Sequence, residues 1–155
     1  MSSTEAALGA STIGITIVFA RIVTGYLCDR VFAPRVAVVA FALSTIGLLM
    51  LATGAVNFSA YVALVLIGFS IGAEIDMMTF LTTRYFGIRH FGEIFGILFA
   101  SLLIGTSLGP FLFGWSYDTH GSYLSILWIA AGATGVATLL CFALPPYSFS
   151  AGDAQ

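Results

Sequence analysis

Five long apolar runs, each separated from the next by a short polar stretch, dominate the pattern of the chain. They span about residues 7–27, 36–56, 59–83, 93–115 and 122–144. Each run has the roughly 20 residues that a helix needs to cross about 30 Å of hydrocarbon. None shows the in-and-out alternation of a strand in a membrane barrel. The pattern therefore predicts an all-α membrane protein with five transmembrane helices and a polar tail at 145–155.

The composition agrees with this prediction. Hydrophobic residues make up 59% of the 155 residues and charged residues only 8%, whereas a soluble domain carries about 25% charged residues. Cys28 and Cys141 lie far apart, without the spacing of a metal site or a disulfide framework. The chain has no lysine and no basic face for nucleic acid. We expect the lipid bilayer as its main partner, and no enzyme activity, cofactor, metal or nucleic acid.

The arginines predict the orientation. All five are expected at one membrane face: Arg21, Arg30, Arg35, Arg84 and Arg89. The opposite turns carry Asn57 on one and Asp118 with His120 on the other. The positive-inside rule places the arginine-rich face in the cytoplasm. The N-terminus is then expected outside the cell and the tail inside.

The first polar stretch carries a motif. Gly25, Leu27, Asp29 and Arg30, followed by Arg35, resemble the cytoplasmic loop motif of the major facilitator superfamily, which joins its second and third or its eighth and ninth helices. Phe32 and Ala33 depart from the family's pattern of a glycine and a basic residue at these places. We expect residues 25–35 to form a tight hydrophilic turn. For this turn alone, an ordinary basic turn is an equally good interpretation.

A glycine-rich stretch three helices later strengthens the resemblance, because the family has such a motif at the corresponding place. It consists of Gly96, Gly105, Gly109, Pro110 and Gly114. On a helix, Ser101, Gly105 and Gly109 stack into a stripe of small residues that permits close packing. Pro110 is expected to kink the helix. A plain packing face and a hinge are both open interpretations.

Residues 72–96 are similar to the tenth and eleventh helices of bacterial members near the oxalate/formate and monocarboxylate carriers. The resemblance covers nearly the whole chain and implies helices eight to twelve of a carrier in a bacterial inner membrane. The seventh helix and the N-terminal half of six helices would be missing partners, so we expect a truncated C-terminal part. A hypothesis of another class is a small non-transporting membrane subunit or a non-functional gene fragment.

Three charged residues are expected inside the membrane. Arg21 lies seven residues before Cys28, and Asp76 lies eight before Arg84, so both are about 10–12 Å from the cytoplasmic face. The resemblance implies that their helices border the central cavity, where Arg21 can pair with Asp76 or Glu74. The two acids point about 200° apart. A site for substrate or coupling ion is one interpretation. The other is that Arg21 snorkels to the interface and the acids pair structurally.

Thr12, Thr16 and Thr24 share one face of the first helix. They either line the cavity or donate to backbone carbonyls of their own helix.

The resemblance also brings together two groups of charged residues at the cytoplasmic face. Asp29 and Arg30 form one, and Arg84, Arg89 and Glu93 form the other. We expect charge-assisted bonds between them. The leading function is transport of a small solute by a secondary carrier, and Arg21 favours a small organic anion.

Overall fold

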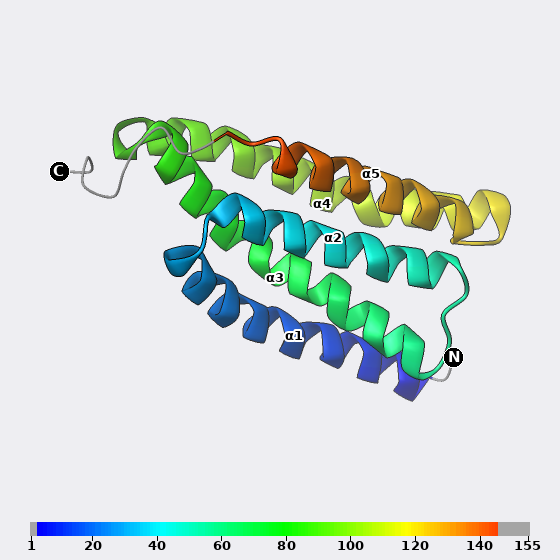
Figure 1. The fold of residues 1–155 in the computed structure, drawn as a ribbon. Coiled ribbons are helices and arrows are strands. Elements are labelled where there is room, and N and C mark those ends of the chain that lie inside the picture. The colour runs from blue at the N-terminus through cyan, green and yellow to red at the C-terminus, as the bar shows by residue number, and fades with distance from the viewer. Residues whose placement is uncertain (1–2, 146–155) are drawn as a thin grey trace. The chain divides into compact units, whose positions relative to one another are not determined.

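The computed structural model describes residues 3–145, with side chains from residue 7 onward. This part of the chain contains helices and no strand (Figure 1). The helices are α1 (Ser3–Arg30), α2 (Ala33–Ala52), α3 (Phe58–Phe86), η1 (Ile88–His90), α4 (Phe91–His120) and α5 (Leu124–Phe142). Each of the five α-helices is long and apolar enough to cross a membrane. The predicted all-α fold with five spans is confirmed. The predicted tail lies outside the described residues beyond Pro145.

The described residues form two compact units. The first contains α1, α2, α3 as far as Met77, and the stretch Leu127–Leu144, which holds most of α5. The second contains the end of α3, η1, α4 and the start of α5, from Met78 to Ile126, together with Pro145. In the second unit the Tyr85 hydroxyl donates to the Pro145 carbonyl.

In the first unit, α1 and α3 approach each other at glycines. A Cβ atom on Gly68 would lie 3.2 Å from the Thr16 side chain, and one on Gly72 would lie 2.6 Å from the Ile17 carbonyl oxygen and 2.8 Å from the Ala20 Cβ. Residue numbers rise together along the contact, so the two helices run parallel, as Figure 1 shows. Their backbones approach to a distance that only glycine permits at residue 72.

The contacts of α2 use small and hydroxyl side chains. A Cβ on Gly47 would lie 2.8 Å from the Ala63 carbonyl oxygen of α3. Helix α2 also contacts α5, where the Thr45 hydroxyl donates to the Thr134 hydroxyl at 3.0 Å. The two helices are close here, since a Cβ on Gly135 would lie 3.8 Å from Thr45. Close backbone approach therefore holds the first unit together more than large apolar side chains do.

The second unit is dominated by α4, which runs without interruption through Pro110. Ser116 is its one buried residue among those described. A Cβ atom added to any of its motif glycines would meet no atom of the described chain within 4 Å, and these glycines are Gly96, Gly105, Gly109 and Gly114. The predicted small-residue stripe thus exists on α4, but its face is open.

The predicted turn over residues 25–35 is wrong in its extent. Helix α1 continues to Arg30, and only Val31 and Phe32 separate it from α2. The Arg30 guanidinium lies 4.4 Å from the centre of the Tyr26 ring one turn earlier, and a cation at a helix C-terminus is favourable. Pro34 stands in the first turn of α2, where its missing N–H costs no hydrogen bond. These features shorten the turn.

Candidate functional site

The candidate site begins with the row of α3 residues that contacts α1. Gly68 contacts Thr16, and Gly72 contacts Ala20. An advance of four residues along α3 therefore corresponds to an advance of four residues along α1. The next step brings Asp76 level with Thr24. Asp76 therefore faces α1.

Glu74 points elsewhere. It lies two residues before Asp76, which turns it about 200° around α3. Its side chain is partly exposed, as is that of Asp76. Of the two acids that the sequence leaves equivalent, only Asp76 continues the row toward α1.

Thr24 is the most unusual polar residue of this contact. Its side chain is 0% exposed, and its hydroxyl is the one buried side-chain polar atom without a hydrogen-bond partner in the described part of the chain. Most buried polar groups in proteins are satisfied, and an orphan costs about 1–3 kcal/mol. The Thr24 hydroxyl is therefore a local cost within the α1–α3 contact.

Thr12 and Thr16 behave differently from Thr24. The Thr12 hydroxyl donates to the Leu8 carbonyl at 2.8 Å, and the Thr16 hydroxyl donates to the Thr12 carbonyl at 2.8 Å. These are the backbone bonds that the second interpretation of the sequence expects. Thr12 also lies nine residues before Arg21, about 180° around α1. Thr12 and Arg21 consequently point to opposite sides of the helix, and a contact of Thr12 with substrate stays a prediction.

Arg21 lies on the flank of the α1–α3 contact. It follows Ala20, which turns its side chain about 100° away from the row that meets α3. The residue is exposed, and among the described residues it forms no ion pair with Glu74 or Asp76. Arg21 and Asp76 share one end of the first unit without touching. The expected pairing of Arg21 with Glu74 or Asp76 is therefore absent from the described residues.

The loop-motif residues surround the short α1–α2 turn. Asp29 and Arg30 end α1 and Arg35 begins α2, and all three are exposed. Gly25 is also exposed, with no atom within 4 Å of an added Cβ. The motif thus presents its charged side chains to the surroundings of the first unit.

The second charged group belongs to the second unit. The Arg84 guanidinium lies 5.1 Å from the centre of the Phe80 ring, which repeats the stacking of Arg30 on Tyr26. Arg89 lies in η1, and Glu93 lies in the first turn of α4, where an acid suits the helix dipole. Contacts between the two charged groups stay a prediction, because the groups belong to different units.

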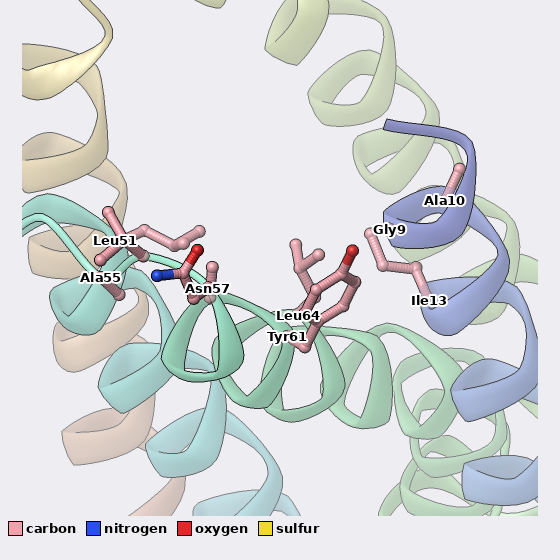
Figure 2. Close-up of a pocket in the computed structure, with 10 residues that line it drawn as sticks. Gly9, Ala10, Ile13, Leu51, Ala55, Asn57, Tyr61 and Leu64 are labelled. Atoms are coloured by element: carbon pink, nitrogen blue, oxygen red, sulfur yellow. The ribbon is translucent and has the colours of Figure 1, made fainter. Parts of the chain in front are cut away.

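The structure also contains a cavity that no sequence motif indicates. It has a volume of about 490 Å³ and lies in the first unit, between the start of α1 and the α2–α3 turn (Figure 2). Its walls are mainly apolar, with Ile13, Leu51 and Leu64 among them, and Asn57 and Tyr61 add polar groups. Gly9 lies against Leu64, since an added Cβ at Gly9 would lie 3.3 Å from the Leu64 Cδ1 atom.

These features define a class. Five helices that are long and apolar enough to cross a membrane, with charged residues within their length, make this a multi-pass α-helical membrane protein. The model of the Major Facilitator Superfamily matches residues 1–154, and the chain belongs to that family.

One curated relative is similar to the chain. It is described as an uncharacterized 38 kDa protein in the 23S RNA operon of Thermoproteus tenax, and it is 29% identical over 136 residues. The match covers 88% of this chain and 35% of the relative, so the chain spans about a third of that protein's length. No solved structure matches the chain.

Proposed function

We propose that this chain forms part of a secondary carrier that moves a small organic anion across a membrane. Family membership is the observation that carries the transport function, because members of the Major Facilitator Superfamily are transporters. Such carriers rock two bundles of helices around a site near the middle of the membrane. No nucleotide hydrolysis is needed for this movement.

The five helices correspond, in this proposal, to helices eight to twelve of a carrier near the oxalate/formate and monocarboxylate branch. The order of the motifs supports this correspondence: the loop motif joins α1 and α2, and the glycine-rich motif follows on α4. The relative, of which the chain matches 35%, is long enough to contain further helices. The rest of such a carrier would supply the other wall of the site.

The proposed orientation places the α1–α2 turn and the α3–α4 turn in the cytoplasm. Arg30 and Arg35 flank the first turn and Arg84 and Arg89 flank the second. The α2–α3 and α4–α5 turns carry no arginine or lysine. The positive-inside rule supports this arrangement.

Arg21 and Asp76 are the proposed functional pair. Arg21 is unpaired in the described chain and offers its guanidinium to a carboxylate substrate. Asp76 continues the row of α3 residues that contacts α1 and is the proposed coupling carboxylate. Ionisable residues within a membrane span are costly, and they mark transport sites more often than they stabilise a fold.

The test is uptake of radiolabelled small mono- and dicarboxylates by proteoliposomes that contain the whole carrier in which this sequence occurs. A pH gradient drives the uptake. Arg21→Ala should abolish saturable uptake, and Arg21→Lys should retain part of it because the charge remains. Asp118→Asn is the matched control, since Asp118 lies in the last turn of α4 and not in the α1–α3 contact. Equal uptake by wild type and Arg21→Ala, or no anion uptake at all, would contradict the proposal.

A further inference from the structure

The cavity between α1 and the α2–α3 turn is separate from the proposed transport site. Ile13, in its wall, lies eight residues before Arg21 and thus about 12 Å away along α1. The volume of the cavity, about 490 Å³, falls in the range of about 300–1,000 Å³ that small-molecule sites occupy. The cavity is partly open to the surroundings of the molecule.

The depth of the cavity in the membrane follows from the α2–α3 turn. Helix α2 ends at Ala52 and α3 begins at Phe58. The backbone groups of the residues between them need water or headgroups, because hydrocarbon offers no hydrogen bonds. The turn, with Asn57, therefore lies at the membrane boundary. Tyr61 lies about 6 Å deeper along α3, and Leu64 about 10 Å deeper.

Polarity changes with depth along this wall. The polar groups of the wall lie in its shallow part, where the Asn57 amide and the Tyr61 phenol stand beside the apolar residues Leu51, Ala55 and Val56. The deeper part, with Leu64 and Ile13, has apolar side chains alone among the described residues. Figure 2 shows the oxygen atoms of Asn57 and Tyr61 on the same side of α3, toward the open space. The cavity thus changes from polar to apolar in the direction in which a lipid does.

The two polar side chains are free to bind. The Ser59 hydroxyl serves the turn itself: it accepts from the Val56 N–H at 3.0 Å and donates to the Val56 carbonyl at 2.7 Å. The Asn57 amide and the Tyr61 hydroxyl have no hydrogen-bond partner among the described residues. Asn57 also holds a left-handed backbone, with φ of 51°, which asparagine tolerates better than most residues.

Charge narrows the class of ligand. None of the described residues that line the cavity is charged, so these residues offer no counterion to an anion or a cation that gives up its hydration. A neutral amide and a neutral phenol suit ester carbonyls and hydroxyls instead. The transported anion does not fit this description.

We propose that the cavity binds one acyl chain of a glycerolipid from the leaflet opposite the arginine-rich turns. The ester or hydroxyl groups of its glycerol region accept from or donate to Asn57 and Tyr61. The chain then runs inward along Leu64 and Ile13. The match between the depth of each wall residue and the part of the lipid at that depth carries the assignment.

The test is retention of lipid by the whole carrier in which this sequence occurs. The carrier is reconstituted in vesicles of palmitoyl-oleoyl phosphatidylcholine or phosphatidylglycerol, extracted in a mild detergent and analysed by native mass spectrometry. The wild-type carrier should retain one lipid at this site with either headgroup, because the described lining residues are uncharged. Loss of all lipid at the gentlest extraction, or retention of phosphatidylglycerol alone, would overturn the proposal.

Three variants locate the bound lipid. Ala10→Trp fills the cavity and should lower retention at least tenfold, whereas Ile15→Trp, on the exposed face of α1, should leave it unchanged. Equal retention in both would overturn the proposal. Tyr61→Phe removes a single oxygen and leaves packing intact, so it separates binding from folding. It should lower retention by about two- to tenfold, the usual effect of one hydrogen bond, and unchanged retention would contradict the assignment of the polar end.

Discussion

Two sets of glycines in this chain differ in what surrounds them. On α2 and α3, an added Cβ at Gly47 or Gly72 would lie within 2.8 Å of another helix. On α4, an added Cβ at Gly105 or Gly109 would meet nothing within 4 Å in the described chain. Glycines on α2 and α3 thus form close contacts between helices, whereas those on α4 lie on a face that no described atom covers. Small residues indicate where a helix can pack closely, but not which helix packs there.

The largest expected effect concerns the completed contact at Gly72. Gly72→Val places a branched side chain where even a Cβ would lie 2.6 Å from the Ile17 carbonyl oxygen. Because that oxygen belongs to the backbone, α1 and α3 must separate. Overpacking of this kind costs about 1–3 kcal/mol or more. The free energy of unfolding in detergent, measured by titration with dodecyl sulfate, should fall by that amount, and an unchanged value would show that the glycine contact is not formed.

The next effect concerns the free hydroxyl at the same contact. Thr24→Val keeps the shape of the side chain and removes an unpaired hydroxyl, so the chain should gain about 1–3 kcal/mol of unfolding free energy. Thr82→Val is the matched control: Thr82 is also buried, but its hydroxyl donates to the Met78 carbonyl at 2.7 Å. Removal of the Thr82 hydroxyl should therefore not raise the free energy of unfolding. A clear destabilisation by Thr24→Val would mean that Thr24 has a partner in the membrane.

A smaller effect is expected where α2 meets α5. Thr45→Val removes the 3.0 Å bond to the Thr134 hydroxyl. Hydrogen bonds between membrane helices contribute about 0.6 kcal/mol on average. Thr138→Val tests the specificity, because the Thr138 hydroxyl donates only within α5, to the Thr134 carbonyl at 2.8 Å. If both variants lose the same unfolding free energy, the bond between helices contributes nothing of its own.

The smallest effect is expected on the open face. Gly105→Ala meets no described atom, and alanine stabilises a helix interior by about 0.5–1 kcal/mol relative to glycine. The purified chain should therefore unfold at a slightly higher dodecyl sulfate concentration. A marked loss of stability would show that another helix already occupies this face in the membrane, and the contrast between the two glycine sets would disappear.

The fold class was predictable from the chain because apolar runs of membrane length admit few structures. The end of α1 was not, because the stacking of Arg30 on Tyr26 and the placement of Pro34 in the first turn of α2 extend the helices into a stretch that looks like a turn. The charged stretch alone suggested a longer loop.

The candidate site was predictable in its residue types but not in its geometry. Glu74 and Asp76 are equivalent in the sequence, and only the contact of Gly72 with Ala20 shows which acid faces α1. Arg21 was expected to pair with an acid, yet its place on the flank of that contact depends on which neighbour α1 has. The cavity near Asn57 and Tyr61 arises from the packing of three separate segments, so no local pattern indicates it.

The central claim is that Asp76, and not Glu74, is the carboxylate of the transport site. The most direct measurement compares Asp76→Asn with Glu74→Gln in proteoliposomes that contain the whole carrier. Uptake of a small organic anion under a pH gradient is measured beside exchange of the anion at equal pH. Asp76→Asn should lose the gradient-driven uptake and keep the exchange, while Glu74→Gln keeps both. Loss of gradient-driven uptake in Glu74→Gln, with Asp76→Asn unaffected, would contradict the account.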